Sequence, residues 1–395
     1  MTDLPSSELP LAGVRIVEFC TVAAGPFCGM LLADMGAEVW KIEAPAGDTL
    51  REWPPHRDGF SENFASLNRN KYSAVLNLKS ADDVALARQL IANADVVIEN
   101  NRPGVMDRLG LGYQALLEVN PRLVFCSISA YGQSGPRAGE GGFDLTIQAA
   151  AGVMSVTGEP EGAPVKCGVP LADFASGLYA AFAIASALRK VAQTGSGMAI
   201  DVPMFGCTLG IAALQTSEYF GNGRSPVKLG SAHPRNAPYQ AFAAADGYFA
   251  IAAGNQKLWE AVCRVMGSPE LATDPRFDST AKRAGNQVEL KDLLEASFRH
   301  QSAAHWVAAF REAGVPSTPI NDYASALADP QVEHMGWVRE IDLPGAGATR
   351  TFISPLRLDG HNLPVRQRPP ALGEHTAALR EQYGATARTP SSEQA

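Results

Sequence analysis

The first 130 residues alternate short apolar runs with helix-periodic segments, and this alternation constrains the fold more than any other feature. Strands are predicted at Val14–Phe19, Val39–Ile42, Ala74–Leu78, Asp95–Glu99 and Leu123–Ser129, and helices at Phe27–Met35, Ala81–Asn93 and Tyr113–Val119. A strand that returns to its sheet through a helix runs parallel to its predecessor. The pattern therefore predicts an α/β fold with an open, Rossmann-like parallel sheet that binds ligands at the carboxyl ends of its strands.

The chain changes character at Val169. Two long apolar helices are predicted there, Phe174–Val191 and roughly Val202–Phe220, and we expect both to be buried because they are hydrophobic nearly all round. Residues 221–240 are rich in Gly, Ser, Pro and Asn, which indicates a linker or a long functional loop. The uncharged stretches are shorter than the roughly 18 residues of a membrane span, so no membrane association is expected.

A smaller domain is predicted after this linker. Its pattern is a strand followed by three helices, at Gly247–Ala253, Lys257–Met266, Leu290–His300 and Ala303–Ala313. We therefore expect a large α/β domain of residues 1–220 and 330–395 and a smaller α/β domain of residues 241–329. The tail after Gly384 is polar and is predicted to be disordered.

Charge and cysteine usage exclude several classes of function. Lys plus Arg number 33 and Asp plus Glu 41, and the resulting net charge of −8 argues against a nucleic-acid partner. The six cysteines form no Cys-x-x-Cys pair and no cluster with histidine, which indicates buried apolar roles in a reducing compartment. The acidic start MTDLPSSELP does not resemble a signal peptide. We therefore expect a cytoplasmic protein.

Three common kinds of catalytic motif are missing. The loop after the first predicted strand, TVAAGP, has a single glycine and so matches neither the dinucleotide-binding nor the phosphate-loop pattern. The seven histidines are dispersed, with none spaced four apart on a predicted helix, so no metal site is expected. No G-x-S-x-G follows a strand, which argues against a serine hydrolase.

One carboxylate, Asp173, stands directly before the first long apolar helix. In the simpler interpretation it is a helix N-cap that accepts a backbone N–H and contributes about 1 kcal/mol. In the other, the helix N-terminus keeps the carboxylate ionised through its dipole and N–H groups. A desolvated but ionised carboxylate could attack a thioester carbonyl as a nucleophile. The local pattern leaves both interpretations open.

Several segments together resemble the family III CoA-transferases, which include formyl-CoA, carnitine and bile-acid CoA-transferases and the related α-methylacyl-CoA racemases. The segments are Leu11–Pro26, Lys41–Trp53, Asn68–Lys79, Glu99–Leu109, Asn120–Gly135, Gly168–Leu188 and Leu372–Thr376. The resemblance implies an interlocked homodimer in which each chain forms a ring threaded by its partner. It also implies that Asp173 is the nucleophile of a ping-pong exchange of CoA between carboxylic acids, through anhydrides and an aspartyl-CoA thioester. CoA is then a substrate, and no separate cofactor or metal is expected.

The resemblance also assigns residues to CoA binding. Lys79, Asn100 and Arg108 match positions that hold the nucleotide end of CoA. Taken alone, they would be a solvated lysine, a strand-end turn asparagine and a surface arginine. A basic residue that often follows KIE in the family is Ala44 here. Trp53 matches an aromatic residue near the acyl group in the oxalate-using members, although a lone tryptophan is more often a core or interface residue.

Two departures from the family pattern narrow the reaction. The racemases carry a His-Asp pair where this chain has Phe143 and Asp144, and racemisation is not expected because phenylalanine cannot exchange a proton. Asp144 itself is interpreted either as a polar orienting group or as a structural cap. The formyl-CoA and oxalate members carry a glutamine at the position of Ala23, which argues against oxalate as a substrate.

The loop His233–Tyr239 is the candidate for acceptor recognition. His233 and Arg235 could pair with the distal carboxylate of a dicarboxylic acid, or the loop could be a linker with incidental charges. Our hypothesis is a CoA-transferase with succinyl-CoA as donor and a C4–C6 diacid such as itaconate, mesaconate, citramalate or glutarate as acceptor. The alternatives are an acyl-CoA racemase or isomerase of the same fold and a non-catalytic CoA-binding subunit.

Overall fold

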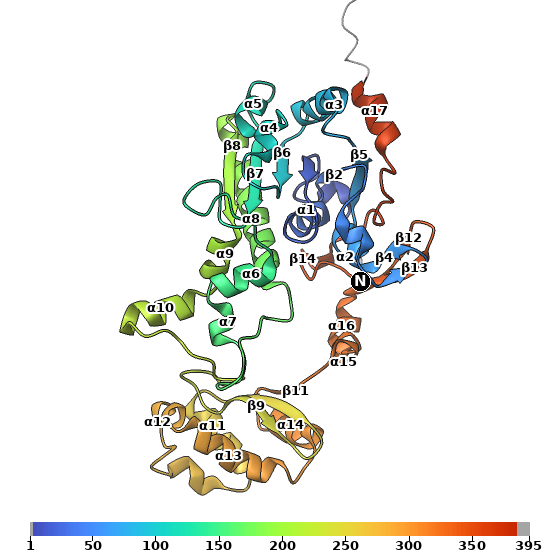
Figure 1. Ribbon diagram of the computed structural model, residues 1–395. Helices are drawn as coiled ribbons and strands as arrows, with labels where there is room; N and C mark the ends of the chain where they lie inside the picture. Colours follow the sequence, from blue (N-terminus) through green and yellow to red (C-terminus); the bar gives the residue numbers. More distant parts are fainter. Residues whose placement is uncertain (1–2, 385–395) are drawn as a thin grey trace, which may run out of the picture. The chain divides into compact units, whose positions relative to one another are not determined.

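The computed structural model describes residues 3–384, so the predicted disorder after Gly384 lies outside the described residues. The chain divides into two compact units (Figure 1). Within the described residues, the first consists of residues 3–153, Cys167–Gly221 and residues 330–384, and the second of Met154–Lys166 and Asn222–Asp329. The sequence pattern places Met154–Lys166 in the large domain, whereas its contacts group it with the second unit.

A six-stranded parallel sheet forms the centre of the first unit, in the order β5-β2-β1-β6-β7-β8. The strands are β1 (Arg15–Phe19), β2 (Glu38–Glu43), β5 (Lys71–Val75), β6 (Val96–Glu99), β7 (Val124–Ser129) and β8 (Met198–Pro203). The central strands β6 and β7 are buried along their whole length, as expected of a parallel sheet covered on both faces. The predicted α/β fold with an open parallel sheet is confirmed.

Helices cover both faces of this sheet. One face carries α1 (Ala24–Asp34) and α8 (Leu171–Thr194), and the other carries α3 (Ala81–Ala92) and α17 (Thr376–Gly384). Side chains of a strand alternate between faces, so Ile16 of β1 joins the apolar cluster under α1 and α8, whereas Val17 joins the cluster under α3. Each face therefore has its own apolar core.

Helix α8 has one buried face and one exposed face, which corrects the expectation that it is buried all round. Ala180 and Ile184 are fully buried, whereas Leu178 and Phe182 are 55% and 73% exposed. By length and composition, α8 is the one helix within residues 3–384 that could cross a membrane, a test that core helices of soluble proteins also pass. Only 39% of its most apolar stretch is buried.

The prediction of a second long helix over residues 202–220 is wrong. Residues 198–222 form strand β8 followed by two helices, α9 (Met204–Ile211) and α10 (Ala213–Asn222). A run of uncharged residues shows no hydrophobic periodicity by which a strand could be told from a buried helix. Here the first residues of the run form a strand because they pair with β7. Strand β5 also begins three residues before the predicted Ala74–Leu78, because the buried polar residues Lys71 and Ser73 concealed its start.

The second unit has a three-stranded antiparallel sheet in the order β11-β10-β9 and its own aromatic core. Its strands are β9 (Tyr239–Ala243), β10 (Tyr248–Ala252) and β11 (Ser317–Pro319), and its longer helices are α11 (Gln256–Val265), α13 (Gln287–Phe298) and α14 (Ala303–Glu312). Phe249 and Phe310 of this core stack with ring centroids 6.1 Å apart. The predicted strand and helices of the small domain agree with β10, α11, α13 and α14, whereas β9 and β11 were not predicted.

The remaining elements are short. They are the 3₁₀ helices η1 (Ser6–Glu8), η2 (Thr49–Glu52) and η3 (Pro269–Thr273), the strands β3 (His56–Arg57), β4 (Phe60–Ser61), β12 (Val338–Leu343), β13 (Gly347–Phe352), β14 (Arg357–Leu358) and β15 (His361–Asn362), and the helices α2 (Glu62–Asn68), α4 (Val105–Arg108), α5 (Tyr113–Leu117), α6 (Asp144–Ala150), α7 (Val153–Val156), α12 (Thr280–Gly285), α15 (Tyr323–Leu327) and α16 (Pro330–Met335).

Candidate active site

A cavity of about 210 Å³ lies in the first unit at the carboxyl ends of β1, β6 and β7. This is the edge at which open α/β sheets bind their ligands. The lining residues are Thr21–Ala24, Asn100–Pro103, Ile128–Ala130, Glu140–Phe143, Asp173 and Met204. Four residues selected from the sequence, Ala23, Asn100, Phe143 and Asp173, thus line one cavity.

Asp173 lies in the first turn of α8, whose N-cap residue is Pro170. The N-cap interpretation of Asp173 is therefore wrong, because the helix begins two residues before it. No group within residues 3–384 donates a hydrogen bond to the Asp173 carboxylate. The carboxylate is thus available to a ligand in the cavity.

Close packing between α8 and α1 places Asp173 beside the loop that follows β1. Gly177, one turn after Asp173, lies so close to the start of α1 that a Cβ atom there would be 2.8 Å from the Ala24 carbonyl oxygen. Phe174 packs against Phe27 of α1, with ring centroids 4.7 Å apart. The missing side chain at Gly177 therefore allows the close approach that brings the first turn of α8 to the cavity.

Burial and a neighbouring charge determine the ionisation of Asp173. Burial first, and then the charge of Asp144, raise the pKa of Asp173 from 3.8 to about 7. This result differs from the expectation that the helix N-terminus keeps the carboxylate ionised. The physical reason is that no N–H group of α8 bonds to the carboxylate, so the loss of water is not offset. Once ionised, a carboxylate of raised pKa is a stronger base and nucleophile than an ordinary one.

Asp144 begins α6 and ties this helix to α8. Its Oδ1 accepts a hydrogen bond from the Ala172 N–H at 2.9 Å, and its Oδ2 accepts one from Gln148 Nε2 at 2.7 Å. Gln148 in turn accepts a hydrogen bond from the Cys167 N–H at 2.9 Å. Asp144 therefore caps the first turn of α8 rather than its own helix. It bonds to Ala172, the residue that precedes Asp173, and its charge acts on the Asp173 carboxylate.

The loop Thr21–Ala24 joins β1 to α1 and forms one wall of the cavity. Asn100, at the end of β6, accepts a hydrogen bond from the Thr21 N–H at 3.0 Å and donates one to the Thr21 carbonyl at 2.9 Å. Val22 has a φ of +66°, a backbone conformation that β-branched residues rarely adopt. Its N–H donates to Asp48 Oδ1 at 3.0 Å. Side chains from neighbouring segments thus hold this loop in an unusual conformation.

Arg102 was not predicted from the sequence. Its side chain is exposed, lines the cavity and approaches Gly141 on the opposite segment. The available signal was its position, two residues beyond a strand-end asparagine at the ligand-binding edge of the sheet. A guanidinium here provides a planar cation that suits a phosphate or a carboxylate.

Three other residues named from the sequence lie outside the cavity lining. Lys79 is exposed in the turn between β5 and α3, and Arg108 is exposed at the end of α4. Trp53 follows η2 and is 48% exposed, so it is not a core residue.

His233 and Arg235 belong to the second unit, whereas Asp173 belongs to the first. The His233 Nδ1 accepts hydrogen bonds from the backbone N–H groups of Arg235 and Asn236, both at 3.1 Å. The imidazole also packs against Tyr239, with ring centroids 5.1 Å apart. His233 thus stabilises its own loop.

The chemistry available in the cavity is that of a carboxylate beside cationic and dipolar groups. No histidine is among the lining residues. Across the part of the chain that the structure describes, no three His, Cys, Asp or Glu side chains are grouped so that they could hold a metal ion. The lining contains two carboxylates, Glu140 and Asp173. Glu140 forms an ion pair with Arg137 at 2.8 Å, so Asp173 is the candidate nucleophile, beside the start of α1 and the cation of Arg102.

Known proteins share both the sequence and the fold. The family model described as CoA-transferase family III matches residues 11–376. The chain is 36% identical to a succinate–glutarate CoA-transferase of Agrobacterium fabrum, over 96% of this chain and 97% of that protein. It is 40% identical to an acetyl-CoA:oxalate CoA-transferase of Acetobacter aceti, over 95% of this chain and 96% of that protein. The crystal structure of a CAIB/BAIF family protein from Brucella suis matches with a TM-score of 0.85 at 40% identity, covering 95% of this chain and 99% of that one. The chain therefore belongs to CoA-transferase family III and is a CoA-transferase.

Proposed function

We propose that this CoA-transferase uses Asp173 as the nucleophile that carries CoA between two carboxylic acids. The observation that carries the proposal is the state of Asp173, a largely buried carboxylate with a pKa of about 7 that lines the cavity at the sheet edge. Burial also limits the access of water, which would hydrolyse an anhydride or a thioester intermediate.

In the first half-reaction the Asp173 carboxylate attacks the thioester carbonyl of the donor, the C–S bond breaks, and CoA leaves as a thiolate. The product is a mixed anhydride. The thiolate then attacks the Asp173 carboxyl carbon and displaces the donor acid as a carboxylate, which leaves an aspartyl-CoA thioester. The acceptor carboxylate attacks this thioester and releases the thiolate, and the thiolate opens the second anhydride at the acceptor carbonyl. Each step exchanges one activated acyl bond for another, so the cycle needs no ATP.

Other groups at the cavity suit the charges that develop. The first N–H groups of helix α1, which begins at Ala24, have no intrahelical partner, and no side chain caps them. They can therefore stabilise the oxyanion of a tetrahedral intermediate. Arg102 can hold a phosphate or a carboxylate of the substrate. On the family resemblance, we assign Lys79, Asn100 and Arg108 to the nucleotide end of CoA.

For the substrates we propose succinyl-CoA as donor and a small dicarboxylic acid as acceptor. Support comes from the relative named for succinate and glutarate. The relative named for oxalate is 40% identical, so overall identity does not choose between acids, and Ala23 remains the argument against oxalate. An Arg235→Ala variant tests the proposed carboxylate contact, which is ruled out if the preference for dicarboxylic over monocarboxylic acceptors is unchanged.

We further propose that the protein acts as an interlocked homodimer in the cytoplasm. The exposed apolar side chains of α8 support a second copy of the chain as the group that covers them. The six cysteines are all free, which suits a reducing compartment.

The test of the nucleophile is to trap the intermediate. The protein is incubated with succinyl-CoA, treated with borohydride, digested and analysed by mass spectrometry. We expect reduction of the aspartyl thioester to an alcohol at Asp173, and no modification or transfer in an Asp173→Ala variant. Unmodified Asp173 in the active protein, or full activity of the variant, would refute the proposal. Tight CoA binding without exchange across a panel of acids would instead indicate a non-catalytic subunit, and α-hydrogen exchange without CoA transfer would indicate a racemase.

A further inference from the structure

A group of charged side chains lies buried between the sheet and α1, next to the loop Thr21–Ala24 that lines the cavity. Glu18 of β1, Lys41 of β2 and Lys71 of β5 are completely inaccessible to solvent, and Asp48, which follows β2, is 1% exposed. Glu18 and Lys41 are direct neighbours in the β1–β2 register. Helix α1 lies so close above them that a Cβ atom at Gly29 would collide with Glu18 Oε2. The charges are therefore part of the interior beneath α1.

These four groups form a connected and electrically balanced chain. Lys41 Nζ lies 3.2 Å from Glu18 Oε1 and 2.9 Å from Asp48 Oδ2. Lys71 Nζ lies 2.9 Å from Glu18 Oε2. Although burial by itself lowers the pKa of Lys41, the charges of Glu18 and Asp48 raise this pKa above its ordinary value, so Lys41 is a cation.

The hydrogen bonds that leave this chain end on the backbone around the cavity loop. Lys41 donates to the Cys20 carbonyl at 2.7 Å, just before the loop, and Lys71 donates to the Pro26 carbonyl at 2.8 Å, just after it. Between these two points, Asp48 Oδ1 accepts the Val22 N–H at 3.0 Å. The loop Thr21–Ala24 is thus fixed at its entry, its middle and its exit by buried charges.

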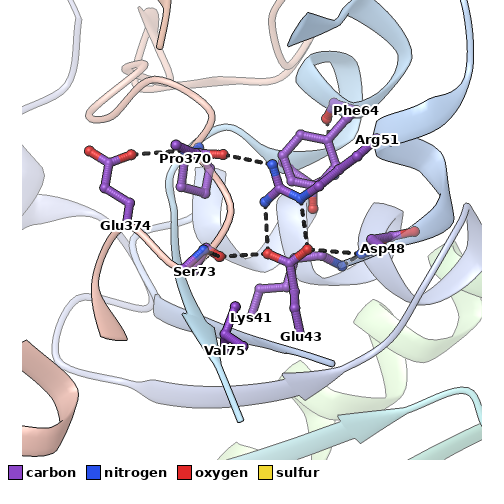
Figure 2. A network of polar contacts seen from close by, with 12 residues as sticks. Lys41, Glu43, Asp48, Arg51, Phe64, Ser73, Val75, Pro370 and Glu374 are labelled. Atoms are coloured by element: carbon purple, nitrogen blue, oxygen red, sulfur yellow. Dashed lines mark hydrogen bonds and ion pairs between the residues drawn. The ribbon is translucent and has the colours of Figure 1, made fainter. Parts of the chain in front are cut away.

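A second pair of charges fixes Asp48 in turn. Glu43 Oε2 accepts the Asp48 N–H at 3.0 Å, and its carboxylate forms a two-bond ion pair with Arg51 (Figure 2). Ser73 donates to the same carboxylate at 2.5 Å. Figure 2 shows that this arrangement places Asp48 beside Glu43, with Lys41 on the strand that carries Glu43.

Stability alone does not account for this arrangement. Buried ion pairs recover little more than the cost of removing their charges from water, and apolar replacements are often at least as stable. The conformation of Val22 suggests a different role for these charges. A β-branched residue with φ of +66° is strained and persists only if its surroundings fix it, and the buried charges do so. Val22 also lines the cavity that contains Asp173.

We propose that Asp48, held by Lys41, is a positioning residue that fixes the loop Thr21–Ala24 and thereby the start of α1 against the Asp173 nucleophile. This inference rests on the proposed function of Asp173. It assigns to the buried charges a role in the acyl-transfer step, because the loop lines the cavity at Asp173. Of the residues assigned to the CoA nucleotide, Asn100 bonds to this loop, whereas Lys79 and Arg108 lie outside the cavity lining.

The test compares two substitutions that each replace a buried, paired aspartate by asparagine. Asp48 Oδ1 accepts the N–H groups of both Val22 and Leu50, whereas Oδ2 faces Lys41. In Asp48→Asn the one remaining oxygen cannot occupy both positions, so either the backbone bonds or the Lys41 contact is lost with little change of shape. The matched control is Asp34→Asn at the other end of α1, where a carboxylate that is 2% exposed pairs with Arg69 and Asn70 rather than with the loop.

For Asp48→Asn we expect kcat per folded molecule to fall roughly 10- to 100-fold, with KM for succinyl-CoA changed less than about threefold. For Asp34→Asn we expect a lower melting temperature but a kcat per folded molecule within about twofold of the wild type. Equal kcat losses in both variants, or no kcat loss in Asp48→Asn, would overturn the inference.

A rescue experiment separates loop conformation from general damage. Glycine adopts positive φ without strain, so a Val22→Gly substitution lowers the need for the Asp48 contact. We expect the double variant Val22→Gly with Asp48→Asn to recover at least about fivefold in kcat over Asp48→Asn alone. Absence of any recovery would contradict positioning through Val22. Trapping at Asp173 in the wild type is measured in parallel, since its failure would refute the proposed function whatever the Asp48 variants do.

Discussion

The pKa of about 7 makes Asp173 a group that titrates in the physiological range. Because only the ionised carboxylate can attack a thioester, kcat/KM for the donor acyl-CoA should rise with pH up to about 7 and level off above it. The measurement is a pH profile of kcat/KM with succinyl-CoA, which reports the free enzyme. A flat profile between pH 5.5 and 8.5 would be inconsistent with a buried Asp173 as nucleophile.

The same profile tests the influence of Asp144. An Asp144→Asn substitution removes the charge that contributes to the raised pKa of Asp173, while the amide oxygen can still accept the Ala172 N–H. We expect the acidic limb of the kcat/KM profile to move to lower pH, with burial keeping it above the ordinary aspartate value. A limb that stays at its wild-type position would show that Asp144 acts only as a cap.

Stability should also depend on the ionisation of Asp173. The folded protein holds this proton more tightly than the unfolded chain, whose pKa is 3.8, so the stabilisation is complete below about pH 4 and is lost as pH rises through about 7. An Asp173→Asn variant cannot ionise and keeps that stability. At pH 8 we expect it to be about 1–3 kcal/mol more stable than the wild type in denaturant unfolding, allowing for partial exposure, and at pH 4 we expect little difference. Equal stability at pH 8 would mean that the carboxylate is not desolvated.

At the scale of elements, the contact between α8 and α1 decides where Asp173 lies. A Gly177→Ala substitution adds only one methyl group, but that group would be 2.8 Å from the Ala24 carbonyl oxygen. Alanine is favoured over glycine inside a helix by about 1 kcal/mol, so a loss of stability would reveal the steric conflict against the intrinsic preference. We expect a lower melting temperature and a lower kcat.

Gly221 in α10 provides the matched control. A Cβ atom at this position meets no other atom within 4 Å, so Gly221→Ala should be neutral or stabilising by up to about 1 kcal/mol. If both substitutions have the same effect on thermal unfolding, the close approach at Gly177 is not a constraint.

Helices and strands could be predicted where apolar and polar residues alternate with a clear periodicity along the sequence. The alternation of apolar strands with amphipathic helices correctly located β1, β2, β6 and β7 because each is bounded by turn residues and polar helix faces. Residues 202–217 include no charged residue and carry no such contrast, so only pairing with β7 shows that this run begins within strand β8. The predicted start of strand β5 was three residues too late, because lysine normally lies at the surface, whereas Lys71 is fully buried and paired with Glu18.

At the scale of the whole molecule, parallel topology explains why part of the site could be predicted and part could not. Ala23, Asn100 and Asp173 lie near strand or helix ends, and a parallel sheet gathers these ends at one edge whatever the order of its strands. The network of Glu18, Lys41 and Asp48 depends instead on register between β1 and β2, which no local pattern specifies. Arg102 was missed because its role depends on the segment that faces it across the cavity.

The exposed apolar face of α8 leads to the prediction about assembly. Leu178 and Phe182 are one helical turn apart and therefore share a face, and α10 in the same unit has no buried residue while its Phe220 is 81% exposed. Apolar surface on this scale is rarely left in contact with water, and a second copy of the chain would cover it. A charge placed on the face should therefore weaken self-association.

We expect a Phe182→Glu variant to sediment as a monomer, or to dissociate at concentrations roughly 100-fold higher than the wild type, because a carboxylate buried in an apolar interface costs about 3 kcal/mol or more. The control is Val288→Glu in the second unit, where the apolar side chain is 74% exposed, almost the same as the 73% of Phe182. If exposure alone governed association, both substitutions would act equally. If α8 carries the interface, only Phe182→Glu shifts the sedimentation coefficient, and a Phe182→Glu protein that assembles like the wild type would place the interface elsewhere.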